Sequence, residues 1–259
     1  MLTAGIDIGS TGTKAILFDG EVRGSAMVPT GWDPKAAGLA AFHRALAAAG
    51  VAESAVHRIV GTGYGRVSLP IFDSKVTEIT CHARGAYHLF PETRTVVDIG
   101  GQDSKVIALD GEGRVADFIM NDKCAAGTGR FLQVMAGVLD ATLEELGLMA
   151  VGADPVPISS MCTVFAESEI VGLLAQGVAK GRIAAGIFDA IARRVQGLAG
   201  RVALSENITF SGGVALNPTI CRAIGDGLGV TLQVPSAPQF VGALGAAVMG
   251  FEHGIGIKF

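Results

Sequence analysis

The sequence predicts an α/β protein made of two related domains that face each other. The first observation is an internal repeat without a gap: residues 7–16 read DIGSTGTKAI, and residues 98–107 read DIGGQDSKVI. The second is that apolar, β-favouring residues flank each copy, so each copy reads as strand, tight turn, strand. The third is the glycine content, 37 of 259 residues, about twice the usual ~7%. Such a content indicates many sharp turns and close backbone approaches.

The elements that follow each copy alternate between strand-like and helix-like patterns. A third strand follows each repeat, near residues 22–28 and 113–120. In chain order, the rest of the first half is predicted as a helix over 33–49, a strand at 56–60 and a helix over 79–90. The helix over 33–49 has a proline just inside its start and Gly50 just past its end, which is typical of helix boundaries. Cys81 and His82, on the next helix, are predicted to be a satisfied interior pair.

The second half is mainly helical in pattern. Its predicted elements are helices over 130–139 and 164–176, a long helix whose apolar stripe runs from Ile183 to Val202, a strand at 208–210, and a last helix over 239–248. Small residues on one side of the last helix predict tight packing against another helix, as in a hinge connector. We therefore expect a first domain over 1–92, a second over 93–237, and a C-terminal helix over 238–259 that returns to the first domain.

Charge and hydropathy exclude several classes of protein. Lys and Arg number 20 against 24 Asp and Glu, a formal charge of -4, which argues against nucleic-acid binding. Mean hydropathy is high, +0.47, but Pro235 and Pro238 interrupt the uncharged stretch 227–251, so no apolar run reaches the ~20 residues of a membrane-spanning helix. The N-terminus has no cationic leader. These features predict a cytoplasmic protein without structural disulfides.

The repeated turns suit the binding of phosphate. Each combines backbone N–H groups at glycines with a Ser or Thr hydroxyl and a Lys, and two such turns facing each other would hold opposite ends of one nucleotide. A single Asp-x-Gly turn is often only a hairpin with a side-chain cap, but the duplication favours the phosphate interpretation. At the repeated turns the sequence has neither the P-loop motif GxxxxGK[ST] nor a dinucleotide-binding GxGxxG motif that leads into a helix. The two hairpins would therefore bind phosphate in a different way.

Four motifs, taken in order, resemble those of the actin, hexokinase and sugar-kinase superfamily. DIGSTGTK, DIGGQDSK, FSGGVALN and VGALGAAV are similar to its first phosphate, second phosphate, adenosine and connecting motifs. Longer strings are NDKCAAGTGRF (121–131), ISSMCTVFAESE (158–169), GTGYGR (61–66) and TCHARGA (80–86). These resemble the activators of (R)-2-hydroxyacyl-CoA dehydratases, also called archerases, within the BadF/BadG/BcrA/BcrD-type ATPases. The resemblance implies actin-like (ribonuclease H-like) domains with ATP or ADP and Mg²⁺ in the cleft between them.

The resemblance also implies roles for individual residues in the ATP site. Those expected at the phosphates are Ser10, Thr11, Gly12, Thr13 and Lys14 from the first domain and Gly101, Gln102 and Asp103 from the second. Asp7 is expected to reach Mg²⁺ through water, or else only to cap its turn. Gln102 or Asp98 would orient the attacking water. Further cofactor contacts are expected at Gly127, Gly129, Gly212, Gly213 and Gln239, the last three beside the adenosine.

Two cysteines are expected to ligate a 4Fe-4S cluster. Such a cluster takes four thiolates, and the strings around Cys124 and Cys162 match the family, in which one cluster bridges a homodimer. Both thiols would lie near helix N-termini, with Thr163 capping the helix after Cys162, where partial positive charge favours an anionic cluster. The alternative is that each is a buried small apolar residue, the common fate of a free Cys, and this interpretation is kept for Cys81 and Cys221.

The implied activity is ATP hydrolysis coupled to electron transfer. A ferredoxin or flavodoxin would reduce the cluster, and the ATP form would dock on an iron-sulfur 2-hydroxyacyl-CoA dehydratase or related reductase, such as benzoyl-CoA reductase. Two alternatives use the same ATP motifs: a small-molecule kinase, which would need an acceptor-binding insertion, and a nucleotide-dependent actin-like scaffold, which would not need the cysteine strings. Which dehydratase or reductase is the partner is not encoded in this chain.

Overall fold

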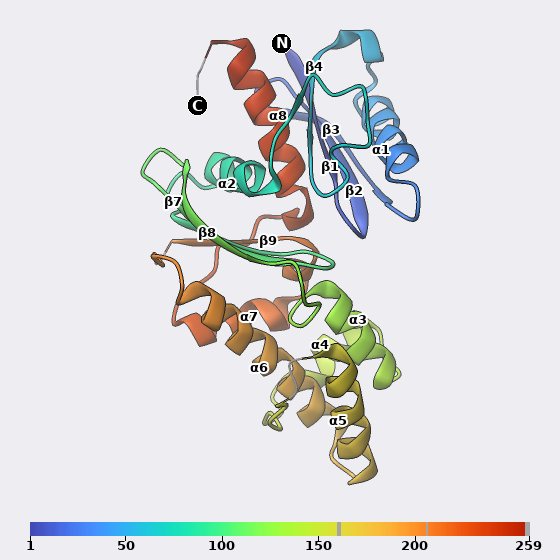
Figure 1. Ribbon diagram of the computed structural model, residues 1–259, viewed down its shortest axis with the longest axis vertical. Helices are drawn as coiled ribbons and strands as arrows, with labels where there is room; N and C mark the ends of the chain where they lie inside the picture. Colours follow the sequence, from blue (N-terminus) through green and yellow to red (C-terminus); the bar gives the residue numbers. More distant parts are fainter. Residues whose placement is uncertain (160–161, 206, 257–259) are drawn as a thin grey trace.

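Each copy of the repeat forms an antiparallel three-stranded unit that is extended by parallel pairing (Figure 1). The structure, a computed structural model, describes residues 1–159, 162–205 and 207–256. The first sheet has the order β3-β2-β1-β4-β5, with strands Leu2–Ile8 (β1), Gly12–Phe18 (β2), Val22–Pro29 (β3), Val56–Thr62 (β4) and Ser74–Lys75 (β5). The second has the order β8-β7-β6-β9, with strands Thr95–Ile99 (β6), Ser104–Leu109 (β7), Val115–Asn121 (β8) and Ile208–Ser211 (β9).

The two sheets share the same strand register at the repeat. Across the first sheet, the aligned residues are Met27, Lys14, Asp7 and Thr62. Across the second, they are Met120, Lys105, Asp98 and Ser211. Each row therefore places an acid, a lysine and a hydroxyl residue side by side on neighbouring strands. The repeat seen in the sequence is a repeat of three-dimensional structure.

Helices lie outside both sheets and between them (Figure 1). Helix α1 (Pro34–Ala49) packs on the outer face of the first sheet, and α2 (Glu78–Leu89) and α8 (Val241–Gly254) lie between the sheets. The largest apolar core lies on the far side of the second sheet. The helices that build or extend this side are α3 (Gly129–Val138), α4 (Leu143–Ala150), α5 (Thr163–Ala175), α6 (Lys180–Ala199) and α7 (Pro218–Leu228). Short 3-10 turns occur at Glu53–Ala55, Gly213–Leu216 and Pro238–Phe240.

Glycines allow α2 and α8 to cross in backbone contact. A Cβ atom at Gly85 would overlap the carbonyl oxygen of Val241, and one at Gly245 would overlap that of Cys81. The side of α8 on which the sequence predicted small residues is therefore the side that contacts α2. Because α8 also packs on β1, β2 and β4, this helix pair connects the two sheets. The domain limits at 92 and 237 stay predictions.

The predicted elements agree with the structure except near their ends. Asp33 accepts a hydrogen bond from the Ala36 N–H and starts α1, and Gly50 ends it with φ +67°. The last helix begins at Val241 and not at Gln239, because a 3-10 turn occupies Pro238–Phe240. Helix α4 was not predicted, although Thr142 and Glu145 form a capping box. Among the described residues no helix is both long and apolar enough to span a bilayer.

Candidate functional site

The first repeated turn joins β1 and β2 and is held by its own backbone and by Thr30. The Gly9 N–H donates to the Gly12 carbonyl at 3.2 Å, and the Thr30 hydroxyl donates to the Gly9 carbonyl at 2.7 Å. Ser10 is partly exposed and Thr11 is exposed. Thr13 differs from them, because its hydroxyl is fully buried against the Thr30 hydroxyl, 2.9 Å away. The Thr13 side chain is therefore directed away from Lys14, its neighbour on the strand.

The second repeated turn joins β6 and β7 and rests on the start of α3. The N–H groups of Gly129 and Arg130 donate to the carbonyls of Gly100 and Gly101 at 2.9 and 2.8 Å. Gly129 thus supports the turn, and its N–H is already used. A Cβ atom at Gly101 would overlap the Thr11 hydroxyl, so the two repeated turns touch each other. The structure brings together the residues expected at opposite ends of a nucleotide's phosphates.

The repeated Asp–Lys pairs differ strongly in burial and in partners. Lys14 Nζ lies 3.3 Å from Asp7 Oδ2 and keeps part of its side chain exposed. The Lys105 side chain is 4% exposed, and its Nζ atom lies 3.2 Å from Asp98, 2.7 Å from Asp103 and 3.8 Å from Glu78. Burial alone would lower the pKa of Lys105, but the surrounding carboxylates outweigh it and raise the pKa above its ordinary value. Lys105 is therefore favoured in its charged form, as the counterion of these carboxylates.

Asp98 is enclosed by hydrogen-bond donors. Its Oδ1 accepts from the Ser211 hydroxyl at 2.9 Å and lies 3.2 Å from His82 Nδ1, while its Oδ2 faces Lys105. Burial alone would raise the pKa of Asp98, but the proximity of His82 and Lys105 and the Ser211 hydrogen bond lower it to about 2. Asp98 is therefore an anion with hydrogen-bond donors at both of its oxygens. The other residue expected to orient water, Gln102, is exposed on the second turn.

The expected adenosine residues lie where β9 ends. Gly212 has φ +90° and a Cβ there would overlap the Ile99 carbonyl, so only glycine fits. Its N–H donates to the Pro238 carbonyl at 3.0 Å, which brings Gln239 close to this turn. Gly213 has open space around its Cα. The Oε1 atom of Gln239 is buried without a hydrogen-bond partner among the described residues, which suits a site that a polar ligand or water completes.

The two predicted cluster ligands lie on the helical side of the second domain. Cys124 is half-buried in the loop before α3, and the Asn121 amide donates to its carbonyl at 2.8 Å. Gly127, in the same loop, has φ +79° and packs near the side chain of Arg194. Cys162 is exposed and directly precedes α5. Part of the ISSMC string, residues 160–161, falls outside the described residues.

The prediction that Thr163 caps α5 is wrong. The helix begins one residue earlier than predicted, so Thr163 is its first residue and Cys162 is its N-cap, without a side-chain hydrogen bond to the helix. The Thr163 hydroxyl is buried with no partner among the described residues. Cys162 therefore lies at the N-terminal end of α5, where the helix dipole is positive. Its sulfur makes no capping hydrogen bond to the helix.

The remaining cysteines have interior character. Cys81 is fully buried, and burial raises the pKa of its thiol to about 12. Cys221 is half-buried near the Ala215 carbonyl, and burial raises its pKa to about 11. Neither thiol is suited to act as a thiolate. Within the described part of the chain, no group of three or more His, Cys, Asp or Glu side chains could hold a metal ion.

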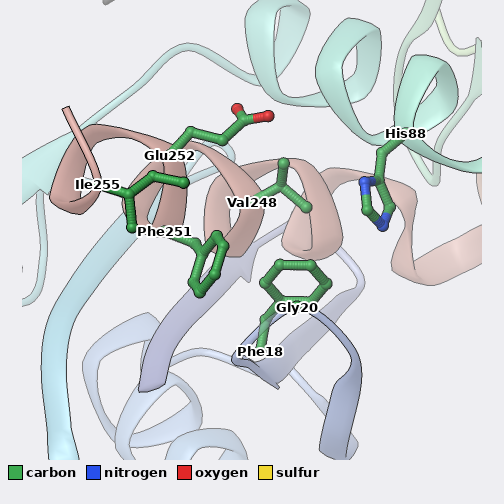
Figure 2. Close-up of a pocket in the computed structure, with 7 residues that line it drawn as sticks. All are labelled: Phe18, Gly20, His88, Val248, Phe251, Glu252 and Ile255. Carbon is green, nitrogen blue, oxygen red and sulfur yellow. The ribbon is translucent and has the colours of Figure 1, made fainter. Parts of the chain in front are cut away.

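A separate hollow lies on the first sheet, away from the repeated turns. It has a volume of about 260 Å³ and is lined by Phe18, Gly20, His88, Val248, Phe251, Glu252 and Ile255 (Figure 2). The rings of Phe18 and Phe251 meet edge to face with centroids 5.5 Å apart. Because Phe18 and Gly12 are at opposite ends of β2, this hollow does not adjoin the repeated turns.

Several residues that complete the site were not predicted. Glu78, His82 and Ser211 surround the second Asp–Lys pair, and Thr30 supports the first turn. His82 was assigned to the interior as a satisfied residue. The position of Ser211 beside Asp98 follows only from the parallel pairing of β9 with β6. The sequence did point to Lys105, because it holds the same position in the second copy of the repeat as Lys14 in the first. It gave no such signal for the other members of this network.

Known proteins similar to this chain match it from end to end. Residues 4–250 match the BadF/BadG/BcrA/BcrD ATPase family. The activator of lactoyl-CoA dehydratase from Anaerotignum propionicum is 44% identical over 254 residues, which cover 97% of this chain and 98% of that protein. The crystal structure of (R)-2-hydroxyglutaryl-CoA dehydratase component A from Acidaminococcus fermentans has a TM-score of 0.94 and 40% identity, covering 98% of this chain and 99% of that one.

Two further structures bear on the ligand and on the fold. The activator of 2-hydroxyisocaproyl-CoA dehydratase from Clostridium difficile with bound ADPNP has a TM-score of 0.92 and 40% identity, covering 100% and 99% of the two chains. A ROK family glucokinase from Streptomyces griseus has a TM-score of 0.60 at 16% identity, covering 96% and 99%, and shows the shared fold alone. The predicted fold class and the resemblance to dehydratase activators are both confirmed.

Proposed function

The chain belongs to the BadF/BadG/BcrA/BcrD ATPase family, and we propose on that basis that it hydrolyses ATP to drive a low-potential electron into an iron-sulfur 2-hydroxyacyl-CoA dehydratase or a related acyl-CoA reductase. The observation that carries the proposal is the match over nearly the whole chain to activators of such dehydratases. A ferredoxin or flavodoxin is the proposed electron donor. Chemistry on the acyl-CoA would then occur in the partner enzyme.

ATP or ADP is proposed to bind where the two repeated turns meet. Lys14 supports this, because it has one carboxylate partner and partial exposure and can turn its ammonium group toward a phosphate. Thr11 and Gly101 contribute the two sides of the contact. Between the two candidates for orienting the attacking water, we favour Gln102, since it is exposed whereas Asp98 is enclosed by three donors.

The charges around the two turns fit a Mg²⁺ ion that accompanies the nucleotide. Two ammonium groups face four carboxylates, those of Asp7, Asp98, Asp103 and Glu78, so the network has an excess of two negative charges. Oxygen ligands of this kind are those that Mg²⁺ prefers, commonly through water. Bound Mg²⁺ would neutralise phosphate charge during transfer to water. Asp7 is the proposed contact, because its only partner among the described residues is Lys14.

A 4Fe-4S cluster is proposed to bridge two copies of the chain through Cys124 and Cys162. The exposure of Cys162 and the partial exposure of Cys124 fit a ligand set completed by a second copy. Helix α5 also fits an interface, since it leaves Val164, Phe165 and Val171 more than half exposed. When bound, the cluster supplies one-electron chemistry at low potential. The loop before α3 and the start of α5 would position the two thiolates and determine their contact with solvent.

The path from nucleotide to cysteines runs through the second repeated turn. This turn accepts hydrogen bonds from the first N–H groups of α3, and the loop before α3 carries Cys124. Helix α3 in turn packs on α5, which begins beside Cys162. A nucleotide that touches both turns would therefore change the position of both cysteines when it is hydrolysed.

Iron and acid-labile sulfide analysis after anaerobic purification tests the proposal. We expect about two Fe and two sulfide per chain in a dimer, lost in Cys124→Ser and in Cys162→Ser. The matched control is Cys221→Ser, which should keep the metal. ATP hydrolysis should be present in the wild type. A metal-free protein that hydrolyses ATP would contradict the electron-transfer role while leaving the ATPase assignment intact.

A further inference from the structure

The GTGYGR loop, residues 61–66, starts in the last residues of β4 and packs against the first repeated turn. The Gly65 N–H donates to the carbonyl of Ile8, the last residue of β1, at 2.8 Å. Gly63 has φ +83°, and a Cβ atom there would overlap the Asp7 carboxylate and the Ile8 carbonyl, so only glycine fits. The loop is therefore fixed beside the carboxylate that is proposed to reach Mg²⁺.

The guanidinium group of Arg66 closes this loop and has unused hydrogen-bond donors. Its Nη1 atom donates to the Gly63 carbonyl at 3.0 Å, and the side chain is partly buried. A guanidinium group has five N–H donors. Among the described residues the Gly63 carbonyl is the one acceptor of this group, and no carboxylate lies within 4 Å of it. Arg66 thus holds a positive charge without an ion-pair partner next to the first turn.

The guanidinium group lies close to Asp7 without pairing with it. The contacts through Gly63 place Arg66 Nη1 within about 9 Å of Asp7 Oδ1. Burial raises the pKa of the Cys81 thiol to about 12. The same thiol is influenced by three charges, since Asp7 and Glu78 raise its pKa and Arg66 lowers it. Arg66 therefore lies on the side of its loop that faces Asp7 and the carboxylates of the second domain.

We propose that Arg66 is a catalytic residue that binds the γ-phosphate of ATP, the phosphate that hydrolysis removes. The inference rests on the proposed nucleotide site and deepens it. A guanidinium group matches phosphate oxygens in both geometry and charge. In well-studied phosphoryl-transfer enzymes Mg²⁺ bridges oxygens of the β- and γ-phosphates. A cation beside Asp7, the proposed Mg²⁺ contact, is therefore at the terminal end of the phosphate chain.

The charge of Arg66 fits the reaction. Water adds to the γ-phosphorus as the bond from that phosphorus to the β–γ bridging oxygen breaks, which yields ADP, inorganic phosphate and a proton. In the transition state, negative charge is spread over the γ-phosphoryl oxygens. The Gly63 carbonyl already holds one N–H group of Arg66 in place, so the remaining donors can stabilise this charge with little reorganisation.

Titration calorimetry with two nucleotides separates this role from a structural one. Arg66→Gln should weaken binding of ADPNP, which has the third phosphate, about tenfold, and should change binding of ADP, which lacks it, less than twofold. Retained ADP binding would also show that the variant is folded. The kcat for ATP hydrolysis should fall about 100-fold. The matched control is Arg58→Gln, which removes the same charge near the other end of β4 and should bind both nucleotides like the wild type.

Repeating the titrations in EDTA distinguishes a direct contact from an effect through Asp7. If Arg66 contacts the phosphate, Arg66→Gln should weaken ADPNP binding relative to ADP binding both with and without Mg²⁺. A difference that appears only with Mg²⁺, equal losses for the two nucleotides, or unchanged ADPNP binding would overturn the inference and leave Arg66 as a support of its loop. A wild-type protein that binds neither nucleotide would overturn the proposed nucleotide site, and this inference with it.

Discussion

The crossing of α2 and α8 predicts that Gly245→Ala strongly destabilises the protein. A Cβ atom built on Gly245 lies 1.8 Å from the Cys81 carbonyl oxygen and 2.8 Å from the Gly85 nitrogen, whereas ordinary contacts begin at 3.4 Å. The helices would have to separate by roughly 1.6 Å, and the clashing atoms are backbone, which cannot rotate away. Overpacking of this kind costs about 1–3 kcal/mol, and the backbone clash favours the upper end.

Chemical denaturation monitored by circular dichroism measures this cost. At about 2–4 °C per kcal/mol for a chain of this size, a loss of about 3 kcal/mol also lowers Tm by roughly 6–12 °C. Gly197→Ala is the control, because it adds the same methyl group to α6 at a position where no neighbouring atom lies within 4 Å of the added Cβ. This control should gain about 0.5–1 kcal/mol, because alanine favours helix over glycine.

A second glycine at the same crossing sharpens the test. A Cβ atom at Gly85 would overlap the Val241 carbonyl, so Gly85→Ala should also destabilise. Once the helices have separated for one methyl group, the second should cost less, and the double variant should lose less than the sum of the single losses. A Gly245→Ala protein as stable as the wild type would refute the idea that backbone contact at the crossing requires glycine.

Three further predictions follow from charge and burial. Lys105→Met should cost about 3–5 kcal/mol of stability, because it removes the ammonium partner of the buried Asp98 carboxylate. Lys14→Met should weaken ATP binding about tenfold or more, as measured by titration calorimetry. The pKa of Asp98 is about 2 in the folded chain against an ordinary 3.8. The ionised carboxylate therefore stabilises the fold above pH 3.8, and this stabilisation is lost as the pH falls toward 2. In urea titrations, the free energy of unfolding should fall less between pH 5 and pH 3 for Asp98→Asn than for the wild type. In cluster-free protein at pH 8, iodoacetamide should label exposed Cys162 and spare Cys81, whose buried thiol has a pKa of about 12; mass spectrometry showing Cys81 labelled first would contradict this.

The repeat made most of the fold predictable from the sequence. Its residues determine both the turn and the alternation of the flanking strands, so the same register appears in both sheets. Helix α1 was equally accessible, because Asp33 and Gly50 mark its ends locally. Helix α4 was missed because it is only eight residues long and lies next to other apolar segments. Its capping box at Thr142 and Glu145 was the available signal.

Long-range packing explains what the sequence could not predict about the site. His82 and Ser211 are 129 residues apart, yet their side chains meet beside Asp98. No periodicity or motif connects them, and a lone histidine on a helix is usually an interior residue. Thr13 shows the opposite case, since its place in the motif suggested a phosphate contact while strand alternation directs its hydroxyl to Thr30. Motif membership gives the backbone position, and packing gives the side chain its partner.

The difference between the two Asp–Lys pairs arises from the helices that cover them. Both pairs occupy the same position in their sheets. Asp7 lies near Gly242 of α8, and Asp98 and Lys105 contact side chains of α2. Helix α2 brings Glu78 to within 3.8 Å of Lys105, whereas the first turn of α8, which lies near Asp7, contains no acidic residue. Lys105 is therefore held in place, and Lys14 keeps the freedom to leave its carboxylate for a phosphate. The duplicated hairpin thus provides a lysine enclosed by three carboxylates, Lys105, and a lysine with one carboxylate partner, Lys14. In the ATP site proposed above, only Lys14 would have to move toward a phosphate.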